Sequence, residues 1–215
     1  MTAGAALADA DLNLTRLAPE ATAPATVEGG QSTAQAMVAA FVADAPGAFE
    51  AVVEAHEEKV TRLAHRLLGW RSGADVQDVV QEVFLAALRH RRRFRGESSL
   101  GTWLSAITVN CCRTRQRRQQ LRRLLLLRWQ KATETEPPAS EAVASQDAAQ
   151  RVRHAVQALP PRDREVVVLR YFEGLDAAGI AAVAGISKNA VEVRLHRARA
   201  RLAETLGAWH EEEQS

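Results

Sequence analysis

The residues best suited to chemistry in this chain are arginines, and their spacing points to a bound polyanion. Residues 89–131 contain thirteen Lys and Arg side chains and one acidic side chain, although the whole chain carries a net charge of only +2. Guanidinium groups stay charged at physiological pH and bind phosphate oxygens in pairs. A basic block of this density predicts contact with a nucleic acid. An acidic protein surface is the alternative partner.

A second basic segment, near the end of the chain, has the pattern of a helix-turn-helix. Gly185 lies in a turn at residues 184–186, and Ser187 is a hydroxyl residue suited to cap the next helix. One face of that helix is apolar, and its members are Val191, Leu195, Ala198 and Leu202. A basic helix after such a turn commonly enters the major groove. The plainer interpretation is a helical hairpin with a solvated basic face.

The elements that must position the first basic block form an upstream helical module, from about Phe49 to Arg118. Apolar residues recur at helical spacing on both sides of a break at residues 69–73. The helix after the break has a mostly polar edge, made of Asp78, Gln81, Glu82, Leu85 and Arg89. Spacing alone predicts a solvated surface there. A loop rich in arginine, glycine and serine at residues 90–99 then opens a third helix, in which Cys111 continues the apolar face.

Composition predicts an all-α protein and offers no catalytic or metal centre. Alanine, leucine, arginine and valine dominate, and no strand-like alternation persists. The six histidines are scattered, the adjacent Cys111 and Cys112 match no zinc or redox spacing, and no phosphate loop stands out. We therefore expect neither an enzyme nor a cofactor. Because the first 45 residues lack a signal-peptide pattern and no apolar run approaches membrane-spanning length, we expect a cytoplasmic protein.

The two modules together resemble the extracytoplasmic-function (ECF, group 4) sigma factors of the bacterial sigma-70 family. The segment DVVQEVFLAALRHRRRFRGESSLGTWLSAITVN, within residues 75–110, resembles region 2 of that family, and residues 158–202 resemble region 4. The resemblance covers about residues 48–207. Response regulators also carry helix-turn-helix sequences like region 4, but they lack the upstream half.

The resemblance implies two small helical domains joined by a flexible linker. A region 2 helical bundle at residues 48–118 would bind core polymerase and recognise and melt the minus-ten element. Residues 119–150 would form the linker, and residues 151–208 would form the region 4 helix-turn-helix that recognises the minus-thirty-five element. Composition adds a mostly disordered extension at residues 1–47, with a helical turn or two near Ala36–Val42, and an acidic tail at residues 209–215.

The resemblance also implies partners and site residues. The polar edge from Asp78 to Arg89 would dock on the clamp of core RNA polymerase, and region 4 would touch the flap. Contacts with minus-ten DNA would come from Phe94, Arg95, Gly96, Glu97, Ser98, Ser99, Trp103, Asn110, Arg113 and Arg117. Contacts with minus-thirty-five DNA would come from Lys188, Asn189, Glu192, Val193, Arg194, His196, Arg197 and Arg201. An anti-sigma factor is a further expected partner, and no membrane insertion is expected.

The resemblance therefore predicts an alternative sigma factor that directs promoter-specific transcription initiation, for a stress or envelope response regulon. Two alternatives stay open, namely a helix-turn-helix regulator that does not act as a sigma subunit and a module that binds polymerase or another acidic protein. The sequence departs from many members at Glu192, where a basic or neutral residue is common, so promoter preference does not transfer. Gly179 also costs its short helix about 1 kcal/mol relative to alanine.

Overall fold

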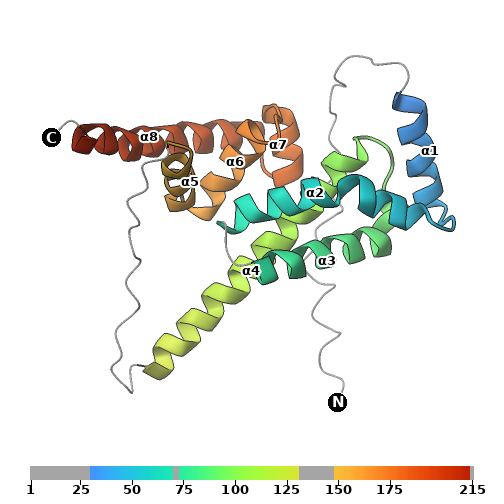
Figure 1. Cartoon of the computed structure of the whole chain (residues 1–215), viewed down its shortest axis with the longest axis horizontal. Helices are drawn as coiled ribbons and strands as arrows, with labels where there is room; N and C mark the ends of the chain where they lie inside the picture. Colours follow the sequence, from blue (N-terminus) through green and yellow to red (C-terminus); the bar gives the residue numbers. More distant parts are fainter. Residues whose placement is uncertain (1–29, 70–72, 131–147, 214–215) are drawn as a thin grey trace.

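The computed structural model describes residues 30–69, 73–130 and 148–213, and this part of the chain is helical without a strand (Figure 1). The elements are α1 (Gly30–Val42), α2 (Ala48–Leu68), α3 (Gly73–His90), the 3-10 helix η2 (Arg91–Arg93), α4 (Leu100–Gln130), α5 (Ala148–Ala158), α6 (Pro161–Tyr171), α7 (Ala177–Ala184) and α8 (Lys188–Glu213). The all-α prediction is confirmed. No helix of these residues is both long and apolar enough to cross a lipid bilayer.

The first bundle consists of α2, α3 and α4, each of which packs against the other two. The apolar stripes predicted for α2 and α3 are buried and include Val52, Leu63, Val79 and Val83. Gly69 ends α2 in the left-handed conformation, with φ of 78°, and its amide donates to the carbonyl of His65. The break between the first two helices therefore lies where glycine allows the chain to turn.

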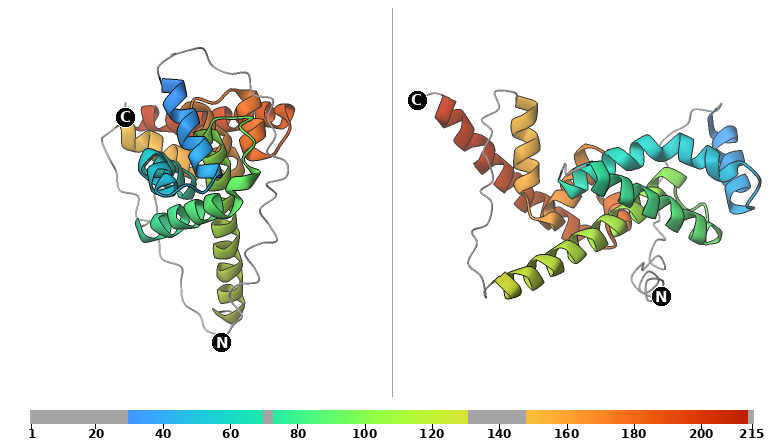
Figure 2. Two further views of the ribbon diagram at one scale, coloured as in Figure 1. Left: turned by 90° about the vertical axis from the view of Figure 1, so that its right-hand side faces the viewer. Right: turned by 60° about the horizontal axis from the view of Figure 1, so that its bottom comes forward.

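The first half of α4 is the centre of the molecule. Every residue from Trp103 to Val109 is buried, although Ser105 and Thr108 are polar. Their hydroxyls donate to the carbonyls of Gly101 and Leu104 within the same helix, which satisfies them without a partner from another element. The second half of α4 projects away from the body (Figures 1 and 2). One continuous helix thus joins the core to a solvated arm.

The second bundle consists of α5 to α8 and contains the predicted helix-turn-helix. Gly185 has a φ of 64° in the turn, and the Ser187 hydroxyl accepts a hydrogen bond from the amide of Ala190 at 3.2 Å. The predicted apolar face of α8 is buried at Val191, Leu195 and Ala198 and half-buried at Leu202. The turn, the cap and the core face predicted from the sequence are all confirmed.

The short helix α7 shows why a glycine is suited to its first turn. Asp176 caps α7, and its carboxylate accepts the amide of Gly179 at 2.7 Å. A Cβ atom at position 179 would lie 3.1 Å from that carboxylate oxygen and 3.5 Å from the Leu175 side chain. The side chains of Asp176 and Leu175 thus leave little room for a Cβ atom at position 179. Glycine fits there, although it lowers the helix propensity of α7.

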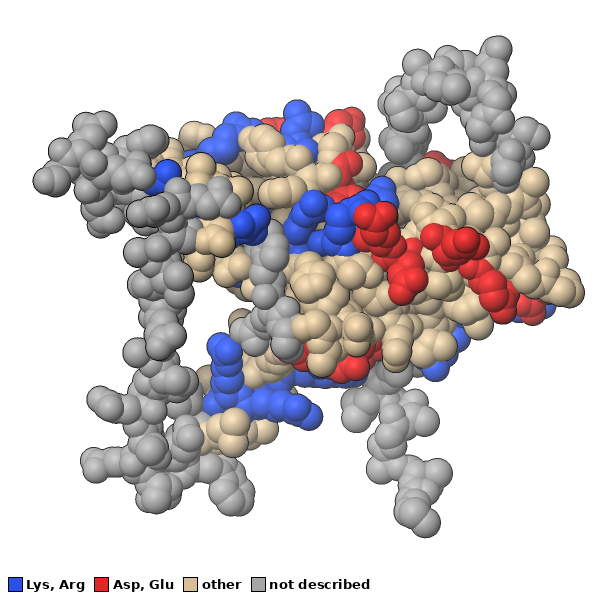
Figure 3. Space-filling model, viewed as in Figure 1, with Lys and Arg blue, Asp and Glu red and all other residues tan. Residues whose placement is uncertain are grey.

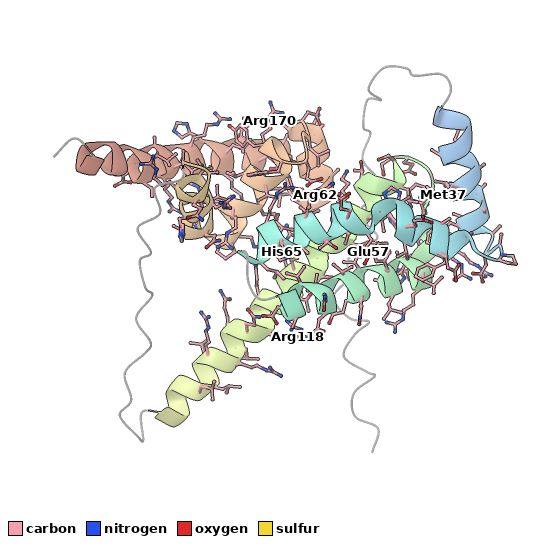
Figure 4. The ribbon with its side chains drawn as sticks, viewed as in Figure 1. Met37, Glu57, Arg62, His65, Arg118 and Arg170 are labelled. Atoms are coloured by element: carbon pink, nitrogen blue, oxygen red, sulfur yellow. The ribbon has the colours of Figure 1, made fainter. Side chains whose placement is uncertain are left out.

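The extension before residue 48 contains the helix expected near Ala36–Val42, and this helix is longer than the turn or two that composition suggested. Helix α1 covers Gly30–Val42, and the ring of Phe41 is buried with 1% exposure. Met37 and Val38 pack partly against the same core (Figure 4), and Asp44 forms an ion pair with Arg91 of η2. Burial of Phe41 in the core holds α1 against the first bundle, which the low-complexity composition of this segment did not indicate. Residues 1–29 lie outside the described residues.

Both ends of the expected linker are helical in the structure. Helix α4 continues to Gln130, and α5 begins at Ala148. The acidic tail expected from residue 209 is part of α8 as far as Glu213. Residues 131–147, which include the Pro-rich part of the linker, lie outside the described residues.

The two bundles pack against each other directly. Helix α7 lies against α4, and α6 lies against α2 (Figure 1). Buried side chains of both bundles form one continuous hydrophobic cluster, with members such as Ile107 in the first and Ile180 in the second. The structure is therefore a closed arrangement, in which the helix-turn-helix rests on the first bundle.

We predict that Phe41→Ala lowers the free energy of unfolding by about 3 kcal/mol, because it removes a fully buried ring and leaves a cavity. Urea denaturation followed by circular dichroism measures the change. Ala39→Ser, at an exposed position of the same helix, serves as the control and should cost less than about 0.5 kcal/mol. Equal stability of the Phe41 variant and the wild type would show that α1 does not dock.

Candidate nucleic-acid interface

The polar edge of α3 is exposed, as the sequence suggested. Asp78, Gln81 and Arg89 are exposed, Glu82 is half-buried, and the apolar side chain of Leu85 is 49% exposed. An exposed leucine flanked by carboxylates is suited to a protein surface that offers an apolar pocket with basic groups around it.

Helix α4 holds the first turn of this edge in place. Arg115 donates to Asp75 at 2.5 Å and to Asp78 at 3.0 Å. The hydrogen bond with Asp75 raises the pKa of Arg115 above its ordinary value. Asp78 is therefore part of a small ion-pair network, whereas Glu82 shows no ion pair among the described residues.

The loop between η2 and α4 is built around two buried rings. Phe94 and Trp103 are both buried, and their rings meet edge to face with centroids 5.4 Å apart and an interplanar angle of 62°. Both side chains are almost completely buried in this structure, and their expected contact with minus-ten DNA stays a prediction. The pair anchors the loop on the core.

The rest of this loop is accessible. Arg95, Gly96 and Glu97 are exposed, Ser98 is half-buried, and Gly96 has a φ of 74°, which favours glycine. Ser99 begins α4, since its hydroxyl accepts the amide of Thr102 at 3.1 Å. The exposed tip is thus fixed at one end by the aromatic pair and at the other by a helix cap.

Asn110, Arg113 and Arg117 lie three and four positions apart, on one side of α4. Asn110 is half-buried and Arg117 is exposed. Arg113 is already bound, because its Nε and Nη2 atoms donate to Glu165 at 2.8 and 2.5 Å, and Nη2 also donates to the carbonyl of Ala184 at 2.7 Å. In this conformation Arg113 contacts the second bundle in place of a phosphate.

The outer edge of α8 presents the predicted reading residues. Asn189, Val193 and His196 are exposed, with 47% of Val193 accessible, and the neighbouring Lys188 and Glu192 are exposed as well. Arg194 is half-buried. Such an edge offers an amide, an imidazole and two methyl groups to the base edges of a major groove.

Two arginines of α8 that are expected to contact minus-thirty-five DNA also pair within the protein. Arg197 and Arg201 both form ion pairs with the buried carboxylate of Asp163. Their distances to it are 3.5 Å for Arg197 and 3.0 Å for Arg201. Their side chains remain half-exposed, so they can still meet phosphates while they neutralise Asp163.

Sequence reasoning missed the acidic residues that organise these arginines. Asp163 and Glu165 lie in α6, Glu173 follows it, and the side chains of all three are almost completely buried. They pair with residues between 34 and 114 positions away, as in Arg197–Asp163 and Lys59–Glu173. The one available signal was the presence of acidic residues inside an apolar helical pattern, where only a paired carboxylate is tolerated.

The projecting arm of α4 is a further basic surface. Leu121, Leu124, Leu125 and Leu126 are between 49% and 60% exposed, beside the exposed Arg118, Arg122 and Arg123. Figure 3 shows basic side chains gathered on this arm at lower left, whereas acidic side chains cover part of α2. Arg118 points away from the body at the start of the arm (Figure 4).

No group of three potential metal ligands occurs among the described residues. Cys111 and Cys112 are free and buried, as the apolar pattern predicted for Cys111. Burial raises the pKa of the Cys111 thiol to about 12, and the carboxylate of Glu82 adds to this effect. Burial likewise raises the pKa of Cys112.

Comparisons with known proteins match both bundles. A sequence model of sigma-70 region 2 matches residues 52–122, and one of sigma-70 region 4 matches residues 149–202. The ECF RNA polymerase sigma factor SigM of Mycobacterium tuberculosis is 33% identical over 176 residues, which cover 80% of this chain and 83% of SigM. RNA polymerase sigma factor CarQ of Myxococcus xanthus is 36% identical over 166 residues, or 76% of this chain and 91% of CarQ.

Solved structures show the same likeness. CnrH in complex with the cytosolic domain of CnrY matches with a TM-score of 0.58 and 30% identity, over 81% of this chain and 97% of CnrH. The sigma factor RpoE of Bartonella quintana, in complex with the anti-sigma factor NepR, shares the fold with a TM-score of 0.56 and 23% identity. That match covers 75% of this chain and 98% of RpoE.

We predict that Cys111 does not react with a maleimide at pH 8 while the protein is folded. A pKa of about 12 leaves roughly one thiolate in ten thousand at that pH, whereas an unfolded cysteine exposes a much larger fraction. Mass spectrometry of peptides labelled with and without denaturant measures the difference. Rapid labelling of Cys111 in the folded protein would contradict the burial of this thiol.

Proposed function

We propose how the parts of this chain, which belongs to the extracytoplasmic-function sigma factors of the sigma-70 family, divide the work of transcription initiation. It is an alternative sigma factor that binds core RNA polymerase and directs promoter-specific initiation. The observation that carries this function is the presence of both sigma regions, in order, on one chain. A helix-turn-helix regulator would need only the second region, so that reading is not favoured.

The first bundle, within residues 48–118, is proposed to bind core polymerase and to open the minus-ten element. The second bundle, within residues 151–208, is proposed to recognise the minus-thirty-five element. Residues 119–150 connect them and pass toward the polymerase active centre. The sigma factor supplies binding and positioning, and polymerase supplies the chemistry, so no catalytic residue or cofactor is assigned. This work takes place in the cytoplasm, where promoter DNA lies.

For the minus-ten element, we assign base contacts to Asn110 and to the exposed loop tip at residues 95–98. The Asn110 amide can pair with the edge of an unstacked base, and the small loop residues let the strand approach closely. Arg113 and Arg117, on the same side of α4, are assigned to phosphates. Phe94 and Trp103 support the loop from beneath.

For the minus-thirty-five element, we assign base contacts to Asn189, Val193 and His196. The amide can pair with purine edges, and the valine methyl groups can contact the methyl group of thymine. Phosphate contacts are assigned to the basic residues around this edge, which are Lys188, Arg194, Arg197 and Arg201. Glu192 is exposed beside the reading edge and disfavours a nearby phosphate.

For protein partners, we assign the α3 edge around Leu85 to the polymerase clamp and the second bundle to the flap. An anti-sigma factor is proposed as a further partner. RpoE of Bartonella quintana, which shares the fold, was solved in complex with the anti-sigma factor NepR, and CnrH was solved in complex with the cytosolic domain of CnrY. The exposed leucines of the α4 arm supply apolar surface that such a partner can cover.

We predict that the double variant Asp78→Lys/Glu82→Lys loses promoter-specific transcription, because it reverses the charge around Leu85 on the proposed clamp contact. Purified core polymerase, a promoter recovered by chromatin mapping and the full chain form the assay. The binding of core polymerase by the variant should fall about tenfold or more, which corresponds to about 1.4 kcal/mol.

The matched control is Glu54→Lys/Glu57→Lys, which makes the same charge change at two exposed positions of α2. Glu57 belongs to α2 and not to the α3 edge (Figure 4). The control should assemble with core polymerase as the wild type does. If the α3 variant assembles equally well, the assignment of this edge is wrong; if the wild type itself directs no initiation, the function is wrong.

We predict that Val193→Ser changes which base pairs of the upstream element are preferred, by about 1–3 kcal/mol at the affected position. Lys188→Ala, about one turn earlier in α8, should instead weaken all sequences alike and reduce the salt dependence by about one phosphate contact. Binding to a library of upstream elements at two salt concentrations separates the two effects. Altered preference in the Lys188 variant, with uniform loss in the Val193 variant, would reverse the assignment.

A further inference from the structure

One row of side chains on α3 combines negative charge with an exposed leucine. Asp78, Glu82 and Leu85 are spaced at i, i+4 and i+7, so they lie on the same side of the helix. The side chain of Asp78 is 59% exposed and Leu85 is 49% exposed, while Glu82 is half-buried and forms no ion pair among the described residues. We call these three residues the acidic row.

The arm of α4 repeats this spacing with the opposite charge. Arg118, Arg122 and Leu125 are also spaced at i, i+4 and i+7, and all three are exposed. Leu121 and Leu126 enlarge the apolar surface next to them, with exposures of 58% and 59%. We call Arg118, Arg122 and Leu125 the basic row. Each row spans about 10 Å along its helix, so the two rows match in length as well as in pattern.

The two rows of one chain cannot meet, because α3 and α4 run in opposite directions. Asp78, early in α3, accepts a hydrogen bond from Arg115 at 3.0 Å. One turn earlier in α4, burial and then the carboxylate of Glu82, one turn later in α3, raise the pKa of Cys111. The arm therefore leaves the body beyond the start of α3, away from the acidic row (Figures 1 and 2).

A second copy of the chain can bring the two rows together. A twofold axis perpendicular to α4 reverses the arm of the second copy, so that this arm runs parallel to α3 of the first copy. With the rows in register, opposite charges face each other at two positions and leucines meet at the third. The facing pairs are Asp78 with Arg118, Glu82 with Arg122, and Leu85 with Leu125 of the other copy. The symmetry forms this contact twice.

Other occupants fit the arm less well. No acidic residue occurs between residues 113 and 130, so two arms repel each other. A nucleic acid would neutralise the arginines of the arm but would leave its exposed leucines in water. A helix with carboxylates and a leucine in the same register satisfies both kinds of side chain, and α3 of a second copy has this pattern.

We propose that the free chain forms a reciprocal homodimer, in which the basic row of each copy docks on the acidic row of the other. Two rows of this length make a small interface, so the dimer is weak and reversible. The dimer follows from surfaces of this chain alone. It also covers the α3 edge that is assigned to the polymerase clamp, and this consequence rests on the proposed function.

Sedimentation velocity of the full chain tests the dimer, at low salt and at concentrations from about 1 to about 100 µM. The wild type should shift from monomer to dimer over this range and should form no larger species, because a reciprocal contact closes on itself. Glu82→Arg and Arg122→Glu should each weaken dimerisation about tenfold or more, since each substitution brings like charges together in both contacts.

A mixture of these two variants gives the decisive result. When Glu82→Arg and Arg122→Glu are mixed, one contact keeps its native charges and the other carries both reversals, so opposite charges face each other in both. The mixture should therefore dimerise within about threefold of the wild type, although neither variant does so alone. Asp78→Arg with Arg118→Glu is the second pair, and it decides the question if circular dichroism shows that Glu82→Arg does not fold.

The matched control is Arg123→Glu, which makes the same charge change about 100° around the arm from Arg122. It should dimerise within about threefold of the wild type. A wild type that stays monomeric up to about 100 µM would overturn the proposal. A mixture that fails to dimerise, or an Arg123→Glu variant as weak as Arg122→Glu, would overturn it as well. None of these results bears on promoter-specific transcription with core polymerase, which tests the proposed function separately.

Discussion

Complete burial of residues 103–109, near the start of α4, is the constraint on which the rest of this structure depends. A helix that is buried on all sides must be covered by several elements, and here α2, α3 and α7 cover it. The same helix carries the polar and basic residues that follow Val109. Their positions are therefore fixed by packing rather than by their own contacts, which is what a surface needs in order to hold a DNA strand in one geometry.

Arginine recurs throughout the molecule with two kinds of partner. Arg115 is bound by aspartates of its own bundle and orders the edge of α3, while Arg113 is bound by a glutamate of the other bundle and ties the two together. Because a guanidinium remains charged in either state, exchange of a carboxylate for a phosphate changes the partner without a change of protonation.

Much of this molecule could be predicted from local sequence. The helix-turn-helix followed from Gly185, Ser187 and an apolar spacing that only one helix face satisfies, and each of these acts within a few residues. The docking of α1 could not be predicted, because Phe41 is a single aromatic residue in a low-complexity segment. The burial of Trp103 against Phe94 could not be predicted either. An aromatic residue near a basic loop can pack in the core or stack on a nucleic-acid base, and spacing does not distinguish the two.

The contact between the bundles was beyond sequence reasoning for a different physical reason. Arg113 and Glu165 lie 52 positions apart, and nothing near either residue indicates which opposite charge it will meet. Electrostatic pairing has no periodicity, so it leaves no pattern comparable to that of a buried helix face. The uneven distribution of charge along the chain nevertheless indicates which residues need acidic partners. Within the basic block of residues 89–131, Arg113 meets the buried carboxylate of Glu165, and a carboxylate buried to this degree depends on its cationic partner.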